Sequence, residues 1–235
     1  QPHAESWHYF VYNNIQSCIF THMHLKRLIE ATMNLPYFDL ATVVQLAQEP
    51  RQSLRMQLSR LIGQGKVNSL RRGMYVLGEP YRKVNPGPAM LANRIYAPSY
   101  LSFHWALGFY GLIPEKVVVY SSATTRVPRV FENEFGRFQY THIKPSCFAG
   151  YRTVVIDRQS VLISEPAKAL LDLWHIEKGE WTVERMASMR FQGFDLVSLR
   201  KLSQYAAMYQ SPRLVRAVSN WRTYIKSETE GTRDL

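Results

Sequence analysis

The stretch from Pro50 to Leu77 constrains the fold most, because a helical period runs straight into a short basic ribbon. Pro50 suits a first helical turn, where its missing N–H leaves no hydrogen bond unmade. Apolar side chains then recur at helical spacing, which predicts that one side of the helix is buried. This side carries Leu54, Leu58, Leu61 and Ile62.

The opposite side of this predicted helix is polar and lacks an acid. It offers hydrogen-bond donors and acceptors together with one soft apolar side chain, a mixture that suits base edges in a DNA groove. Its members are Gln52, Ser53, Met56, Ser59, Arg60 and Gly63, with Arg55 on the flank.

A basic β-hairpin is predicted directly after the helix. Gly65 ends the helix as a C′ glycine, and β-prone runs follow at Val67–Leu70 and Met74–Val76. The turn between them places Arg71 beside Arg72. Folding alone gives little reason for two adjacent arginines, whereas DNA phosphates would supply the counter-charge. The alternative is a solvated basic hairpin beside an ordinary amphipathic helix.

The charge balance favours a polyanionic partner. Among 235 residues, 29 Lys and Arg face 18 Asp and Glu, so the formal net charge is +11. Residues 23–87 hold ten basic and four acidic side chains, and residues 88–235 hold nineteen and thirteen, so each segment has a net charge of +6. Because the first segment is less than half as long, its net positive charge per residue is more than twice as high. This asymmetry points to nucleic acid at the N-terminal segment.

The two cysteines, Cys18 and Cys147, form neither a disulfide framework nor a Cys-based zinc site. We therefore expect a reducing, cytoplasmic setting. The sequence has no apolar run of 18 residues and no secretion signal, so we expect no membrane association.

Two further helices are predicted before Pro50, at Leu25–Thr32 and after Asp39, which suits a helix N-cap. Three helices and a ribbon predict a winged helix-turn-helix DNA-binding domain over residues 23–78. Residues 1–22 are interpreted as an N-terminal arm or an added leader. A linker is predicted over residues 79–87, which contain the turn-forming residues Pro80, Asn85, Pro86 and Gly87.

Residues 88–235 predict a larger mixed α+β domain, with strands in the middle and helices at both ends. The expected strands are 117–121, 126–131, 137–142, 153–156 and 161–163. The expected helices are 88–96, 100–110, one opening at Glu165 and Pro166, 183–190, 195–208 and 212–225.

Four stretches resemble the AbiEi antitoxins of type IV toxin-antitoxin (abortive infection, phage defence) systems. They run from about Gly65 to Trp174 and cover nearly half of the chain: GKVNSLRRGMYVL, ANRIYAPSYLSFHWALGFYGLIPE, TTRVPRVFENEFGRFQYTHIKP and LISEPAKALLDLW. The resemblance implies a transcriptional autorepressor whose winged helix binds repeats in its own promoter. It also implies that the C-terminal domain counters a nucleotidyltransferase toxin without forming a stable complex with it.

The residues expected to contact double-stranded DNA combine base readers with phosphate contacts. Arginine suits guanine, Gln52 suits adenine, and Met56 can pack on a thymine methyl group. The predicted set is Gln52, Ser53, Arg55, Met56, Ser59, Arg60, Lys66, Arg71 and Arg72. A possible second basic surface comprises Arg126, Arg129, Arg137 and Lys144, although these side chains more often pair with local acids such as Glu132 and Glu134.

An enzyme is the competing hypothesis, alongside a stand-alone winged-helix regulator without a toxin. A nuclease would use Glu132, Glu134 and Asp157 as Mg²⁺ ligands, or Glu165 with Lys168. Their spacing fits no nuclease motif, and Glu165 is better explained as a first-turn acid with Lys168 one turn on. We therefore predict no catalytic residue, no metal and no cofactor.

The aromatic residues between positions 96 and 110 have two interpretations. They could stack on exposed bases, but their helical setting favours core packing. The set is Tyr96, Tyr100, Phe103, Trp105, Phe109 and Tyr110.

Overall fold

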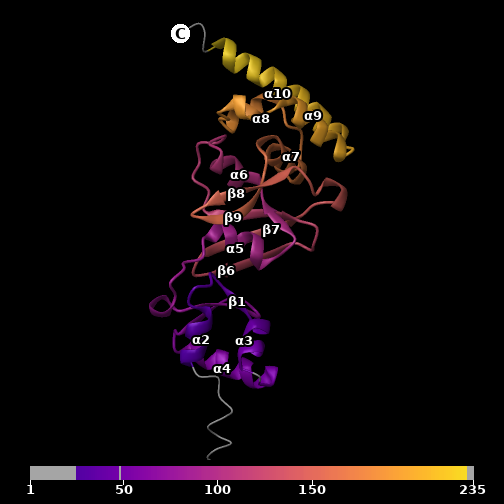
Figure 1. Ribbon diagram of the computed structural model, residues 1–235. Helices are drawn as coiled ribbons and strands as arrows, with labels where there is room; N and C mark the ends of the chain where they lie inside the picture. The colour runs from indigo at the N-terminus through magenta and orange to yellow at the C-terminus, as the bar shows by residue number, and fades with distance from the viewer. Residues whose placement is uncertain (1–24, 48, 232–235) are drawn as a thin grey trace, which may run out of the picture. The chain divides into compact units, whose positions relative to one another are not determined.

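The computed structural model describes residues 25–47 and 49–231 (Figure 1). The contacts divide the chain into two compact units, residues 1–86 and 87–235. The mixed α+β class predicted from the sequence is confirmed. The predicted arm, residues 1–22, lies outside the described residues.

In its described residues, unit 1 has three helices and a small antiparallel sheet with the strand order β1-β3-β2. The helix predicted at Leu25–Thr32 has those bounds. The two-residue strand β1 was not predicted, because it is too short to show a period. The elements are α2 (Leu25–Thr32), β1 (Phe38–Asp39), α3 (Leu40–Ala47), α4 (Arg51–Gly63), β2 (Val67–Arg71) and β3 (Met74–Leu77), followed by the 3-10 helix η1 (Glu79–Tyr81).

Local hydrogen bonds explain where α3 begins and α4 ends. The Thr42 amide and hydroxyl donate to Asp39 Oδ1 at 2.8 and 3.0 Å, so the predicted N-cap is confirmed. After α4, the Lys66 amide donates to the Leu61 carbonyl and the Gly65 amide to the Ile62 carbonyl. This is a Schellman motif, and Gly65 has the positive φ of 67° that it requires.

The core of unit 1 collects apolar residues from its helices and from the hairpin, and α4 contacts α3 and β2 there. Leu54 and Leu58 of α4 are fully buried, and Leu61 and Ile62 are partly buried against the same cluster. The predicted buried side of α4 is therefore confirmed. The other core members are Leu28, Phe38, Val43, Val67, Tyr75 and Leu77.

Unit 2 is built on a six-stranded sheet with the order β6-β7-β5-β4-β9-β8. Two of its pairings are parallel, β4 with β9 and β5 with β7, and the others are antiparallel. The strands are β4 (Ser99–Leu101), β5 (Val119–Thr124), β6 (Arg129–Asn133), β7 (Gly136–His142), β8 (Tyr151–Ile156) and β9 (Gln159–Ser164).

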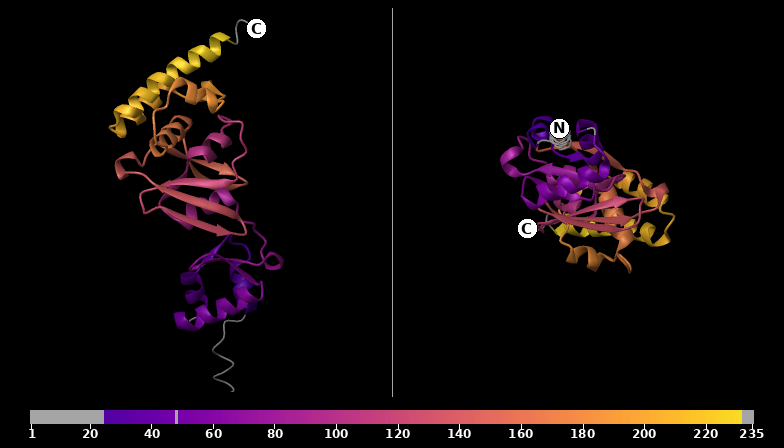
Figure 2. Two further views of the ribbon diagram at one scale, coloured as in Figure 1. Left: turned by 180° about the vertical axis from the view of Figure 1, so that it is seen from behind. Right: turned by 90° about the horizontal axis from the view of Figure 1, so that it is seen from below.

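The helices of unit 2 cover the sheet and then build outward from it (Figures 1 and 2). α5 packs against β4, β5 and β9, and α6 packs against β5 and α7. α7 in turn contacts α9 and α10. The helices are α5 (Pro88–Ile95), α6 (Phe103–Phe109), α7 (Pro166–Ile176), α8 (Val183–Ser188), α9 (Leu199–Met208) and α10 (Pro212–Gly231), with 3-10 helices η2 (Pro145–Cys147) and η3 (Phe194–Leu196).

The sequence interpretation was wrong for residues 100–110, which do not form one helix. Ser99–Leu101 is the strand β4, which pairs on both sides and is completely buried, and α6 begins only at Phe103. A short apolar run looks the same in a central strand and in a buried helix, so periodicity does not distinguish them. Likewise, the predicted helix 195–208 splits into η3 and α9, and α10 extends past residue 225 to Gly231.

None of the helices in the described part of the chain combines the length and the apolar character that crossing a bilayer requires.

Candidate nucleic-acid interface

The polar side of α4 is exposed over most of its length. Gln52, Arg55, Ser59 and Arg60 are all exposed, and the Met56 side chain is 63% exposed despite its apolar character. Arg51, which the sequence interpretation did not select, is exposed at the first turn. The mixture of donors and one apolar side chain that was predicted for this side therefore lies at the surface of unit 1.

An acid reaches the N-terminal end of this side from the preceding turn. The Glu49 carboxylate accepts hydrogen bonds from Ser53 Oγ at 2.9 Å and from Gln57 Nε2 at 2.6 Å. Gln57 Nε2 also donates to Ser53 Oγ at 3.1 Å. Ser53 is thus half-buried and engaged within the protein, unlike its neighbours on α4. Sequence spacing shows only that Glu49 precedes the helix, not that its side chain folds back.

The hairpin after α4 carries the two adjacent arginines at its tip. β2 pairs with β3 from Val67 opposite Leu77, with an irregularity between Ser69 and Arg71. Gly73 closes the turn with a φ of 81°, a conformation that favours glycine. Because Arg71 still pairs with Met74, strand β2 extends to Arg71, one residue further than predicted.

The basic side chains of the hairpin differ in their surroundings. Arg71 and Arg72 are exposed, and Lys66 is half-buried. Arg71 Nη1 donates to the Arg72 carbonyl at 3.0 Å. The Thr42 amide holds the pKa of Asp39 below its usual value, and the positive charge of Arg71 adds to that effect. Arg71 is thus close enough to the start of α3 to be partly balanced by an acid.

The remaining arginines of this surface keep their charge unmatched within the described chain. Among residues 25–47 and 49–231, no ion pair joins Arg55, Arg60 or Arg72 to an acid. Exposed cations without local partners are available to phosphates, whose contacts position a protein on a duplex. We define Arg51, Gln52, Arg55, Met56, Ser59, Arg60, Arg71 and Arg72 as the α4–hairpin surface.

The second basic group of the sequence interpretation lies on unit 2, where its members have different roles. Arg126 Nη1 donates to the Ala97 carbonyl at 3.0 Å, and its guanidinium lies 4.2 Å from the centre of the Tyr96 ring. Arg129 lies 5.8 Å from the Phe131 ring. Arg137 stands opposite Glu132 in the β6–β7 ladder, and Lys144 precedes η2. Cation–π contacts, rather than the expected acids, engage the first two arginines.

The acids considered for a nuclease are distributed over different elements. Glu132 belongs to β6 and Glu134 follows that strand, whereas Asp157 begins the turn after β8. β6 and β8 are the two edge strands of the sheet. Among the described residues, no three His, Cys, Asp or Glu side chains are grouped as metal ligands would be.

Glu165 and Lys168 do not form the pair that their spacing suggested. Glu165 accepts hydrogen bonds from Lys201 Nζ at 2.8 Å and from Tyr205 Oη at 2.7 Å. Burial alone would raise the pKa of Glu165, but these two hydrogen bonds outweigh it and hold the pKa below its usual value. Glu165 therefore joins the start of α7 to α9, and Lys168 turns away from it.

Lys168 belongs to a buried polar cluster that the sequence interpretation missed. Its ammonium and the Asp172 carboxylate are both 0% exposed and form an ion pair. Lys168 Nζ also donates to Tyr100 Oη at 2.9 Å and to Tyr209 Oη at 2.8 Å, and Ser102 Oγ donates to Asp172 Oδ2 at 2.7 Å. Burial raises the pKa of both tyrosines far above the usual value, and the negative charge of Asp172 adds to it.

This buried cluster ties together β4, α7 and α9. The sequence contained a signal for this cluster. A helix that is apolar on every side is buried, and the few polar residues within it are then buried as well. Residues 166–174 of α7 fit that description, with a Lys and an Asp one turn apart. The sequence interpretation placed Lys168 one turn after Glu165 and did not consider Asp172 as its partner.

The aromatic residues of positions 96–110 are mainly core residues, as expected. Tyr96, Tyr100 and Phe103 are buried, while Phe109 remains 44% exposed and stacks on Trp105. The tyrosine hydroxyls find partners: Tyr96 donates to the Val127 carbonyl, and Tyr110 donates to the Ser164 carbonyl.

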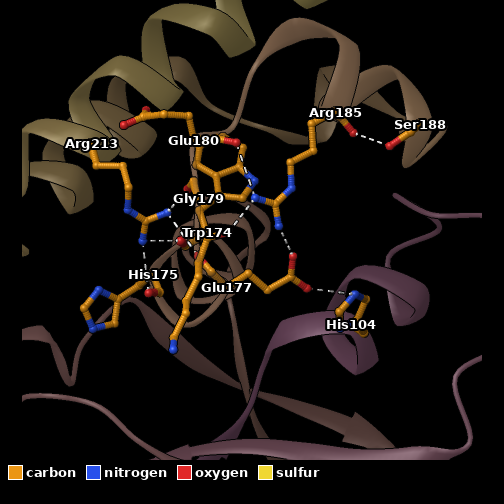
Figure 3. Close-up of polar contacts among 10 residues, drawn as sticks. His104, Trp174, His175, Glu177, Gly179, Glu180, Arg185, Ser188 and Arg213 are labelled. Atoms are coloured by element: carbon orange, nitrogen blue, oxygen red, sulfur yellow. Dashed lines mark hydrogen bonds and ion pairs between the residues drawn. The ribbon is translucent and has the colours of Figure 1, made fainter.

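Two arginines hold the loop between α7 and α8 (Figure 3). Arg213 donates to four carbonyls at the end of α7, including that of Trp174 at 2.7 Å and that of Gly179 at 2.7 Å. Arg185 Nη2 pairs with Glu177 at 2.5 Å, and its guanidinium lies 3.9 Å from the Trp181 ring. Arg213 thereby satisfies carbonyls that a helix leaves unbonded at its C-terminus.

Comparison with known proteins gives no family for this chain: no family model matches it, and no curated protein does.

Proposed function

We propose that this protein binds double-stranded DNA through a winged helix-turn-helix in unit 1 and acts as a transcriptional autorepressor. The observation that carries the proposal is the α4–hairpin surface, where the exposed Arg55, Arg60 and Arg72 form no ion pair with an acid of the described residues and accompany a mixed polar and apolar side of α4. In this proposal α4 is the recognition helix, and the hairpin between β2 and β3 is the wing.

The order of elements in unit 1 supports this assignment. Helix α2, strand β1, helices α3 and α4, and the β2–β3 hairpin follow one another, with β1 pairing beside β3. In helix-turn-helix proteins the recognition helix enters the major groove. Because the apolar side of α4 is held in the core, its polar side is the one left for such a groove.

The residue types support a division of labour across this surface. Arg55 and Arg60 can donate in bidentate fashion to guanine, Gln52 to adenine, and Met56 can contact a thymine methyl group. Arg71 and Arg72 at the hairpin tip would contact phosphates, with Lys66 beside them, which fixes register without reading sequence. Ser53, bound to Glu49, is the weakest member of the predicted set.

The antitoxin part of the proposal comes from the resemblance to AbiEi antitoxins. Unit 2 would then counter a nucleotidyltransferase toxin without a stable complex, and the second basic group, Arg126, Arg129, Arg137 and Lys144, would be a further nucleic-acid contact. A stand-alone regulator without a toxin has the same unit 1. Co-expression with a nucleotidyltransferase encoded next to its gene distinguishes the two. An antitoxin restores the growth of cells that produce the nucleotidyltransferase and does not co-purify with it, whereas a stand-alone regulator does not restore growth.

Binding of labelled duplexes to the full chain tests the DNA proposal directly. One duplex carries the sequence upstream of the protein's own gene, and the other is a scrambled duplex of the same composition. We expect tighter binding to the first, and log affinity falling linearly with log salt by about 0.9 per phosphate contact. Equal affinity for both duplexes would contradict the proposed role as a repressor. An affinity that does not change with salt concentration would contradict the proposed phosphate contacts.

A further inference from the structure

Unit 2 contains a cavity of about 500 Å³ that the buried polar cluster and the proposed DNA surface do not use. It lies where α6, β5, β7 and the ends of α7 and α8 meet. This volume falls in the range of pockets that hold small organic ligands, which are mostly apolar with a few polar groups at defined places. The main apolar walls are Phe103, Ile113, Val117, Val119, Ile176 and Met189.

The cavity leaves apolar side chains in contact with water. Val118 is 72% exposed and Ile176 is 37% exposed, and both line the cavity. Exposed apolar surface beside a cavity is stabilised when a ligand covers it, because burial removes that surface from water. The walls therefore favour a ligand with an apolar body.

The polar groups at the cavity carry an excess of positive charge. Of the residues that line the cavity, Glu115 is acidic, and it pairs with Arg190. Glu177, which lies beside His104 but does not line the cavity, pairs with Arg185. Among the described residues no acid pairs with Lys116, which also lines the cavity.

His104 adds a second nitrogen donor at the same place. Its Nε2 lies 3.7 Å from Glu177 Oε1, so Glu177 stands between His104 and Arg185 (Figure 3). Gln139 and Thr141, which share a face of β7, also line the cavity. These side chains offer hydrogen bonds, while Lys116 supplies the unmatched charge.

We propose that this cavity binds an amphipathic organic acid with one carboxylate and an apolar, ring-sized body. The body would contact Phe103, Ile113 and Val119, and the carboxylate would lie toward Lys116 and His104. An anion in a partly enclosed site near a cation gains a charge-assisted hydrogen bond that a neutral molecule lacks. This inference concerns unit 2 alone and does not depend on DNA binding.

Three probes of one shape test the charge of the ligand by calorimetry on the full chain: 2-naphthoate, 2-naphthamide and 2-naphthylmethylammonium. We expect 2-naphthoate to bind most tightly and the neutral amide about fivefold more weakly. Lys116→Met should weaken 2-naphthoate to the level of the amide without changing amide binding. The matched control is Lys226→Met, on the exposed end of α10, which should change neither.

Filling the cavity tests its location. Val119→Trp, or Thr141→Trp if the first variant has an altered circular dichroism spectrum, should abolish binding of 2-naphthoate. Val155→Trp is the control, because Val155 is 73% exposed on β8 and does not line the cavity.

Three results would overturn the proposal. These are absence of 2-naphthoate binding, equal affinity for the acid and the amide, and unchanged binding in the cavity-filling variants. Sedimentation tests a second copy of the chain as the occupant: a dimer that Val118→Asp dissociates would mean that protein, not a small acid, covers this cavity.

Discussion

The α4–hairpin surface of unit 1 and the buried cluster of unit 2 both concentrate polar side chains, but they treat charge in opposite ways. In unit 2, Lys168 and Asp172 are withdrawn from water and their charges are matched within hydrogen-bonding distance. In unit 1, Arg60 and Arg72 are exposed, and within the described residues no acid pairs with them.

The difference teaches how to separate structural charges from candidate binding charges. A buried charge is costly unless it is paired, so a satisfied buried pair belongs to the fold. An exposed arginine contributes little to folding and retains its electrostatic field for a partner. Substitutions in the buried cluster of unit 2 should therefore act on stability, and those on the α4–hairpin surface should act on binding.

The largest effect is expected from breaking the buried pair. Asp172→Asn leaves the Lys168 ammonium buried without a counter-charge, and we expect a loss of about 3–5 kcal/mol in the free energy of unfolding. Denaturant titration followed by tryptophan fluorescence measures it, because Trp105, Trp174 and Trp221 belong to unit 2.

Two controls accompany this prediction. Replacing both partners, as Lys168→Met with Asp172→Leu, should cost less than Asp172→Asn alone, since no unpaired charge remains. Glu30→Gln breaks the exposed Lys26–Glu30 pair and should leave the unfolding midpoint unchanged. If the Asp172→Asn protein were as stable as the wild type, the buried pair would not be needed for folding, and the contrast between the buried cluster and the α4–hairpin surface would be contradicted.

A smaller effect, on binding rather than stability, is expected from the arginines of unit 1. Arg60→Ala should reduce discrimination between the upstream and scrambled duplexes by about 1–3 kcal/mol. Arg72→Ala should weaken binding to both duplexes alike and lower the salt slope by about 1.

Salt-titrated anisotropy distinguishes these two outcomes, with Lys226→Ala as the control on unit 2. Neither arginine variant should shift the unfolding midpoint. If Arg60→Ala unfolded the protein instead, Arg60 would be needed for folding. The distinction between the exposed charges of unit 1 and the buried charges of unit 2 would then be wrong.

The smallest effect is a pH dependence from the partly exposed pair that joins α7 and α9. The pKa of Glu165 is lowered in the folded protein, so its contribution is present above its unfolded pKa and is lost as the pH falls below that value. The pKa of Tyr205 is raised to about 12, so its contribution is lost as the pH rises from 10 toward that value.

Lys201→Met should therefore narrow the stability difference between about pH 7 and about pH 3. Tyr205→Phe should remove part of the loss on the alkaline side. Urea midpoints measured from about pH 3 to about pH 12 test both predictions. An unchanged stability profile below about pH 7 in Lys201→Met would show that Lys201 does not hold the Glu165 carboxylate.

Elements that depend on neighbours in the sequence were predicted well. The bounds of α2, the Asp39 cap and the glycine stop after α4 follow from hydrogen bonds that span a few residues. Most of the expected polar side of α4 is also exposed, because a helix that packs one apolar side into the core leaves its other side at the surface.

The sequence by itself thus specified what neighbouring residues encode: the amphipathic helix α4 with its glycine stop, the Asp39 cap of α3, the arginine-tipped hairpin and the mixed α+β class. The tertiary structure alone decided that Ser99–Leu101 is a central strand, that Glu49 folds back onto Ser53, and that Lys168 and Asp172 are buried with Tyr100 and Tyr209. These features join residues up to 72 positions apart. The periodicity of a single segment does not predict such contacts, because they form only when separate elements pack together.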